Sequence, residues 1–376
     1  MKKKNLCLGL FLLALAGLWT GCSNNEPVED PANNQVISFR VQGSLPSPKV
    51  PGTTDTYMNA FVVNAYGDVT GKGANAKATM LATIVYRKEG GGFDYNPKVF
   101  YFAGDSEVEF SAYSPVSPNI TNGLGKTGTT NTITYTVREP EQTKGDNSQE
   151  DLLVAYTKQV KADFSKNVTL NFKHALSRVY VTAKNKTSET VIIDSIKLVN
   201  LYEEGTLDID ATGWSGATSE VNINKGYNTI TSTSSFNEYK VLWTIPGQQK
   251  KSYTYVLPPS GVAVPASTVL PTYVVSKEQG MLILPQTTVN ENNNSIADPG
   301  DFYLEVSYRV SNITETAKIA FKDINNINPT AAKEGLTFEF GRQYALNISF
   351  DDIINQAISF DVKVEDWDTP VSTVNP

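Results

Sequence analysis

The sequence contains little of the chemistry on which most enzymes and metal proteins depend. Its 376 residues include two cysteines, Cys7 and Cys22, and one histidine, His174. Because both cysteines lie at the N-terminus, a disulfide scaffold is excluded, and a single histidine excludes a histidine-based metal cluster. A Ser-His-Asp arrangement would have to use His174, which lies in an apolar, strand-like run and is interpreted as a structural residue. We therefore expect no enzymatic activity, no cofactor and no metal.

Basic residues are also too few for a nucleic-acid-binding protein. The 32 Lys and Arg residues are outnumbered by 39 Asp and Glu residues, and the net charge is −7. The sequence has no basic stripe, so nucleic acid is not expected as a partner. The glycines at 90–92 are not followed by a helical pattern and predict a hairpin turn rather than a phosphate-binding loop. Residues 291–301 are rich in Asn and Asp, but they lack the spacing of a known calcium loop.

The one long apolar run lies at the N-terminus. Residues 6–19 follow the lysines at 2–4, and the run is shorter than the roughly 20 residues that a membrane-spanning helix needs. This pattern predicts a secretion signal over residues 1–21. Thr20, Gly21 and Cys22 then match a bacterial lipobox, although Trp19 departs from the usual leucine. We expect lipidation of Cys22, with residues 22–34 as a polar tether. The alternative is an ordinary signal peptide with an incidental cysteine.

The rest of the chain shows the alternating apolar and polar residues of β-strands, separated by turns rich in Gly, Pro and Asn. Strands do not alternate with long amphipathic helices, so an α/β fold is excluded. Polar loops are expected at residues 122–130 and 214–234, and one helical turn at residues 329–334. Strands are expected at residues 36–41, 58–66, 78–86, 93–102, 108–113, 131–137, 152–156, 168–172, 175–185, 191–201, 205–209, 239–245, 253–257, 268–275, 281–285, 302–310, 316–321, 336–340, 344–350 and 358–364.

These short strands predict an all-β protein made of two tandem β-sandwich domains. We place the N-terminal sandwich at residues 35–174 and the C-terminal sandwich at residues 175–376. The joint is expected within residues 151–185. In this segment, residues 168–172 should end the first sandwich and residues 175–185 should begin the second.

Six runs, taken in order along the chain, carry a resemblance to a known protein family. They are FSAYSP (110–115), DLLVA (151–155), LNFKHALS (170–177), LILPQ (282–286), FGRQY (340–344) and ISFDVKVEDW (358–367). No single run is diagnostic, but the ordered set behind a lipobox resembles the fimbrillin family of Bacteroides-type bacteria, in particular its fimbrillin A/Mfa-like branch. The resemblance covers nearly the whole chain after the secretion signal.

The resemblance implies transthyretin-like or immunoglobulin-like sandwiches and a role as a structural subunit, anchor or tip component of adhesive cell-surface fimbriae. It implies a surface-exposed lipoprotein of the outer membrane, whose partners are other fimbrial subunits and a host or bacterial surface ligand. It also implies removal of an N-terminal segment by a trypsin-like protease that cuts after Arg, and then polymerisation by strand exchange.

The two ends of the chain supply the candidates for strand exchange. Arg40, the first Arg of the sequence, is the candidate cleavage site, and Lys49 is an alternative; otherwise Arg40 lies on the polar face of a retained strand. Loss of the first strand would expose an apolar groove. The last strand repeats the I-S-F-x-V pattern of the first, and either fills the groove of a neighbour or, as the cost of an unfilled sandwich favours, completes its own domain. The candidate exchanged residues are Ile37, Phe39, Val41, Ile358, Phe360 and Val362.

A second class of function stays open, that of a non-polymerising surface lipoprotein that binds glycans or host ligands. Trp214 lies in a segment rich in Gly, Ser and Thr and is the candidate surface aromatic for stacking on a sugar. Trp243 and Trp367 lie in strand patterns and are expected to pack in the core.

Overall fold

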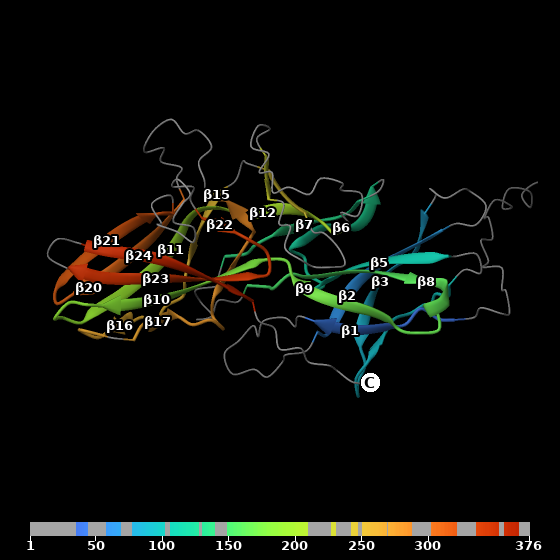
Figure 1. Ribbon diagram of the computed structural model, residues 1–376, viewed down its shortest axis with the longest axis horizontal. Coiled ribbons are helices and arrows are strands. Elements are labelled where there is room, and N and C mark those ends of the chain that lie inside the picture. Colours follow the sequence, from blue (N-terminus) through green and yellow to red (C-terminus); the bar gives the residue numbers. More distant parts are fainter. Residues whose placement is uncertain are drawn as a thin grey trace, which may run out of the picture.

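The computed structural model describes residues 35–43, 58–68, 77–101, 106–127, 130–139, 149–209, 227–230, 242–246, 250–268, 270–287, 302–321, 336–352 and 357–367. Within these residues the regular elements are β-strands, apart from short pieces of 3₁₀ helix such as η2 (Lys161–Asp163). The prediction of an all-β protein is therefore confirmed. The described part of the chain has no helix with the length and apolar character needed to cross a bilayer. Figure 1 shows an elongated molecule, with the first strands at one end and the last strands at the other.

The first sheet (sheet 1) has seven strands, and β1 lies at one of its edges. β1 is parallel to its neighbour β9, whereas the other pairs are antiparallel. The residues before β1 also pair with those after the opposite edge, because the Ile37 N–H donates to the Val99 carbonyl (2.9 Å). The spatial order is β1 (Phe39–Gly43), β9 (Val168–His174), β8 (Leu153–Val160), β5 (Glu107–Ser114), β2 (Ala60–Asp68), β3 (Lys77–Arg87) and β4 (Phe93–Asp94).

Period-two alternation explains the core of sheet 1. In β9 the side chains of Val168, Leu170 and Phe172 are buried, while those between them are exposed or half-buried. This is the pattern of a strand with one face on the core and the other toward solvent. The inward side chains of β1, β2, β5 and β8 join them in one hydrophobic cluster.

The second sheet (sheet 2) joins strands from both sides of residue 175. β7 pairs with β12 from Glu204↔Thr136 to Asp208↔Thr132. Strands from both sides of residue 175 therefore share one sheet. The division into two domains at that residue stays a prediction. The spatial order is β13 (Tyr227–Ile230), β14 (Leu242–Pro246), β12 (Glu204–Asp208), β7 (Thr130–Thr136) and β6 (Ile120–Thr127).

Two further sheets pack against each other at the other end of the molecule (Figure 1). The ring of Tyr308 in one sheet lies 5.1 Å from that of Phe350 in the other. Sheet 3 runs β17 (Thr272–Val275), β10 (Ser177–Asn185), β23 (Arg342–Asp352) and β24 (Ala357–Asp366), with β18 (Met281–Ile283) also on β10. Sheet 4 runs β15 (Lys250–Thr254), β11 (Val191–Tyr202), β20 (Tyr303–Val310) and β21 (Ile313–Ala320), with β16 (Val262–Val264) also on β11. A separate pair is β19 (Gln286–Thr287) with β22 (Thr337–Phe338).

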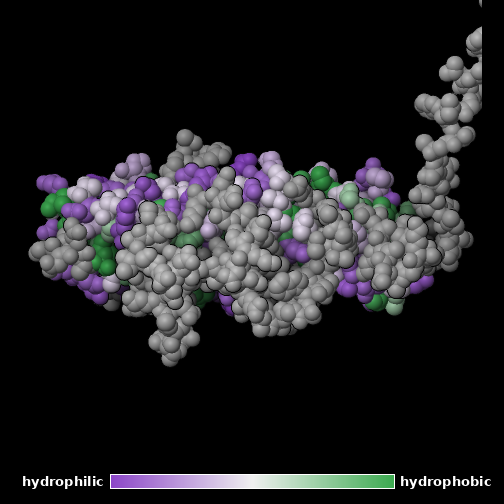
Figure 2. Space-filling model, turned by 90° about the horizontal axis from the view of Figure 1, so that it is seen from above, coloured by the Kyte–Doolittle hydropathy of each residue, from purple (hydrophilic) through white to green (hydrophobic). Residues whose placement is uncertain are grey.

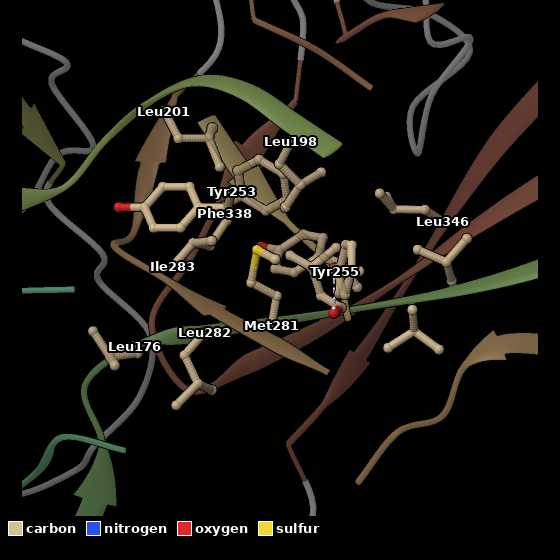
Figure 3. Close-up of a cluster of buried hydrophobic side chains, with 14 of the residues drawn as sticks. Leu176, Leu198, Leu201, Tyr253, Tyr255, Met281, Leu282, Ile283, Phe338 and Leu346 are labelled. Atoms are coloured by element: carbon tan, nitrogen blue, oxygen red, sulfur yellow. Dashed lines mark hydrogen bonds between the residues drawn. The ribbon is translucent and has the colours of Figure 1, made fainter. Parts of the chain in front are cut away.

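The core between sheets 3 and 4 is built from apolar side chains that converge from several strands. Figure 3 shows Tyr253 and Leu198 from sheet 4 facing Met281 and Ile283 from sheet 3. Tyr255 is fully buried, and its hydroxyl donates to the Val179 carbonyl at 2.6 Å. Burial raises the pKa of Tyr255 well above its ordinary value, so its hydroxyl stays a donor.

Three expected elements differ in the structure. In the expected strand 93–102, the described residues 93–101 form only the short β4, because Pro97, which lacks an N–H, cannot join a strand ladder. Residues 122–127, within the expected loop 122–130, belong to β6, whose backbone pairs with β7 although its sequence is mostly polar. Residues 227–230, within the expected loop 214–234, form β13. The helical turn expected at residues 329–334 lies outside the described residues.

Candidate functional site

The first strand is bound on one side by β9 and packs inward with three apolar side chains. Ile37, Phe39 and Val41 are buried, as their alternation in the sequence predicts. The parallel register with β9 runs from Phe39↔Val168 to Gly43↔Phe172. β1 is thus an edge strand, the kind of strand that can be removed without breaking a sheet in two.

Aromatic side chains surround the inward face of β1. The ring of Phe39 lies 5.8 Å from Phe61, 5.8 Å from Tyr95 and 6.0 Å from Phe110. The Tyr95 hydroxyl donates to the carbonyl of Ile37 at 2.8 Å, and burial raises the pKa of Tyr95. Removal of β1 would therefore leave a groove with an aromatic floor and unpaired backbone groups on β9.

Arg40 lies in the middle of β1, opposite Thr169 of β9. Its side chain is half-buried, and its Nε atom is buried with no hydrogen-bond partner among the described residues. The peptide bond that follows Arg40 lies inside a paired strand. A protease could reach that bond only after β1 has opened, because proteases cleave unfolded or locally opened chain.

The last strand, β24, is paired with β23 and completes sheet 3 in this structure. The antiparallel register extends from Asp352↔Ala357 to Arg342↔Asp366. β24 also lies at an edge, and its inward side chains are only half-buried, whereas those of β23 are fully buried. Its role as a donor strand stays a prediction. The half-buried side chains are Ile358, Phe360, Val362 and Val364.

Glu365 connects the outward face of β24 to neighbouring elements. Its carboxylate accepts hydrogen bonds from Lys277 at 2.6 Å, Gln343 at 3.2 Å and Tyr180 at 3.3 Å, and it pairs with Lys363 at 2.8 Å. The hydrogen bonds and positive charges of Lys277 first, and then of Lys363, lower the pKa of Glu365 from its ordinary 4.5 to about 2. The carboxylate thus helps to hold the end of β24 against the rest of sheet 3.

We expect Glu365→Gln to remove a part of the acid sensitivity of the protein. Because folding lowers the pKa of Glu365, its contribution is present above pH 4.5 and is lost as the pH falls toward 2. The substitution should lower stability by about 0.5–1 kcal/mol at pH 7, the range of exposed ion pairs. Thermal unfolding between pH 7 and pH 2 should show the two proteins converging at the acid end; a constant difference would contradict the assignment.

A cavity of about 640 Å³ opens at the outer end of sheets 3 and 4, where β20 turns into β21 and β23 ends. Ile313 at its mouth is 63% exposed. Of its four carboxylates, Asp351 is paired with Lys186 (2.6 Å) and Glu189 accepts a hydrogen bond from Ser311 (2.7 Å). The four carboxylates on the wall of the cavity are Glu189, Glu315, Asp351 and Asp352.

Elsewhere on the described surface seen in Figure 2, apolar residues form separate spots among hydrophilic ones.

His174 lies at the joint, where β9 ends and the chain passes into β10. Its Nδ1 atom lies 2.8 Å from a carboxylate oxygen of Asp151, and both side chains are 1% exposed. Its ring stacks on Trp367, which is buried as expected. This burial fits the structural role predicted for His174. No group of three or more His, Cys, Asp and Glu side chains within the described segments could hold a metal ion.

Gln149 lies just before the joint. The sequence gives no signal of its contacts, because Gln149 lies near the end of a polar, loop-like segment. Its Nε2 donates to the carbonyls of Arg138 and Leu282, each at 2.8 Å, and its Oε1 accepts from the Leu282 N–H at 2.7 Å. A single side chain therefore binds β18 to residues that precede the joint.

Several predicted site residues lie outside the described residues. These are the lipidation site Cys22, the alternative cleavage site Lys49 and the candidate surface aromatic Trp214, together with residues 291–301. The side chain of Trp243 also lies outside the described part. The roles given to these residues stay predictions from the sequence.

Among the described strands, the first and the last both lie at the edge of a sheet. The chain matches the fimbrillin-like family over residues 54–367 and belongs to that family. The family places it among fimbrial and adhesion-related proteins of the cell surface, for which no enzymatic role is indicated. The matched region begins after the end of β1.

The chain is similar to solved structures, of which one with a TM-score above 0.5 supports the fold. A fimbrial protein from Bacteroides vulgatus ATCC 8482 is 16% identical, with a TM-score of 0.52 over 89% of this chain and 100% of that chain. The tip fimbrial protein Mfa3 from Porphyromonas gingivalis, with a C-terminal truncation, is 11% identical, with a TM-score of 0.41 over 88% of this chain and 100% of that chain. No curated protein sequence matches the chain.

Proposed function

We propose that this protein is a structural subunit, or an anchor or tip component, of cell-surface fimbriae and that it is assembled by strand exchange. In this proposal residues 1–21 direct export, and Cys22 carries the lipid that attaches the protein to the outer membrane. Residues 22–34 form the tether, and residues 35–174 and 175–376 form the two sandwich units. The supporting observation is that β1 is an edge strand whose apolar side chains fill an aromatic groove.

Strand exchange would replace β1 with a strand of another subunit. Cleavage after Arg40 would remove Ile37 and Phe39 and leave Val41 at the new N-terminus, from which an incoming strand would displace it. Three large apolar side-chain sites would then be open, each stabilised by about 1.5–3 kcal/mol when filled. Unpaired backbone groups on β9 would accept a new strand at the same time. β24 offers Ile358, Phe360 and Val362 with the same I-S-F-x-V pattern. Arg40 is the proposed cleavage site, with cleavage following the opening of β1.

Analysis of the protein released from the cell surface tests this proposal. We expect an SDS-resistant ladder on unheated gels, an N-terminus shortened to follow Arg40, and fatty-acid label in the unprocessed precursor that Cys22→Ala abolishes. The ladder reports assembly and N-terminal sequencing reports processing, so the two can fail separately. A full-length lipidated monomer, with no ladder, would contradict the proposal.

The alternative is a non-polymerising surface lipoprotein that binds glycans or host ligands. The cavity with its four carboxylates is the observation that favours it, because carboxylates and hydroxyl-bearing side chains are suitable partners for sugar hydroxyls. Trp214 is its other candidate contact. A monomer that shifts on glycan-containing gels, with the shift lost in Trp214→Ala or Glu315→Ala, would support this alternative over fimbrial assembly.

A further inference from the structure

The end of β24 is more deeply buried than the strand itself. The inward side chains Phe360 and Val362 are half-buried, and β24 has a neighbour on one side only. Trp367, the next residue after the strand, is 6% exposed. An edge strand with half-buried side chains is among the weaker parts of a sheet, so a buried residue at its end has a large influence on whether it stays in place.

Trp367 contacts side chains from two different sheets. Its indole ring stacks on the His174 ring, with centroids 3.7 Å apart and planes 3° from parallel. The guanidinium carbon of Arg178 lies 4.4 Å from the centre of the Trp367 ring. His174 ends β9 in sheet 1, and Arg178 lies on β10 in sheet 3. One ring that follows β24 thus contacts two strands, β9 and β10, with which β24 is not directly paired.

The same ring helps to cover a buried pair of polar side chains. His174 and Asp151 are 1% exposed and 2.8 Å apart, and the burial that lowers the pKa of Arg178 is opposed by Asp151 and Glu278. Buried polar and charged groups are stable only while their partners and their cover are in place. Loss of the indole would let water reach these groups and would remove the flat surface on which His174 and Arg178 lie.

A relay of backbone hydrogen bonds supports the position of Trp367. Its N–H donates to the Gly341 carbonyl at 3.2 Å, and the Gly341 N–H donates to the Leu176 carbonyl at 2.9 Å. Gly341 adopts φ +64°, a left-handed conformation that glycine accepts without strain. The turn at Gly341 therefore links the end of β24 to the joint between β9 and β10.

We infer that Trp367, held by His174, Arg178 and Gly341, is a clasp that keeps β24 in its own sheet. The clasp must open before β24 can leave to pair with another subunit. The second statement rests on the proposed function, whereas the first concerns the single chain and can be tested on it alone. The clasp explains how a chain with a weakly buried last strand can stay closed until it meets a partner.

Hydrogen exchange on the full chain tests the clasp. Trp367→Ala is expected to make the backbone amides of residues 358–366 exchange roughly 10- to 100-fold faster, with little change in β20. Leu304→Ala is the matched control, because Leu304 is fully buried in β20 and lies outside the clasp. We expect the control to speed exchange in sheets 3 and 4 together. An even increase in Trp367→Ala, or none in residues 358–366, would overturn the inference.

A milder variant tests the same inference in case Trp367→Ala does not fold. His174→Gln keeps a hydrogen-bonding side chain beside Asp151 but removes the ring beneath the indole, and we expect about a threefold to tenfold increase in exchange confined to β24. Polymer formation on unheated gels gives the second measurement. Faster exchange with faster assembly supports both the clasp and the donor role of β24. Faster exchange with unchanged assembly supports the clasp and contradicts the donor role of β24. Unchanged exchange in a protein that still polymerises contradicts the clasp alone.

Discussion

Phe39→Ala in the unprocessed chain is expected to lower the free energy of unfolding by about 3–5 kcal/mol, the range for a buried phenylalanine. The Phe39 side chain is buried and lies within 6.0 Å of three other rings, so truncation leaves a cavity and removes ring contacts. Urea unfolding measures the change. Gln42→Ala is the control, because Gln42 lies on the opposite face of β1 and should change the stability by less than about 0.5 kcal/mol.

The same substitution separates strand exchange from a retained first strand. If β1 is removed before assembly, residue 39 is absent from the finished polymer, and the Phe39→Ala polymer should dissociate at the same temperature as the unaltered one. If β1 stays in place, the polymer should be weakened along with the monomer. An equal loss in both species would therefore show that β1 is not the strand exchanged.

The strands that could be predicted from the sequence are those whose two faces differ in environment. In β9 and β20, buried apolar residues alternate with exposed or half-buried ones, and burial of one face forces that alternation. β6 was missed because it is an edge strand with polar side chains, held by backbone bonds to β7 that leave no apolar pattern. The segment after β4 was expected as strand from its apolar residues, but Pro97 ends the ladder.

The sequence indicates the candidate site only where the residues of a pattern lie close together in the chain. The repeated I-S-F-x-V pattern identifies β1 and β24 without a structure. The stacking of His174 on Trp367 joins residues far apart in the chain, and neither residue has a local pattern that indicates the other. The parallel pairing of β1 with β9 is likewise a tertiary contact, since parallel neighbours require a long connection and no short turn marks them.

Gln149→Ala is expected to weaken the joint between the two ends of the molecule and to lower the free energy of unfolding by about 2–5 kcal/mol. The side chain is buried and is the hydrogen-bond partner of both the N–H and the carbonyl of Leu282, which is itself buried. Truncation leaves those groups unsatisfied, at a cost of about 1–3 kcal/mol each. Since Gln149 also holds the Arg138 carbonyl, the loss should loosen β18 relative to residues that precede the joint.

Small-angle X-ray scattering should then show a wider distribution of distances in Gln149→Ala at temperatures where it is folded. Gln159→Ala is the matched control. Gln159 is also buried; its Nε2 donates to the Asp163 carbonyl at 2.6 Å and the Lys166 carbonyl at 3.0 Å, and its Oε1 accepts from the Tyr101 hydroxyl, so all three partners lie before residue 175. The control should lose stability and keep the shape of the unaltered protein. Identical scattering from the two variants would mean that Gln149 stabilises the fold without setting the angle between its ends.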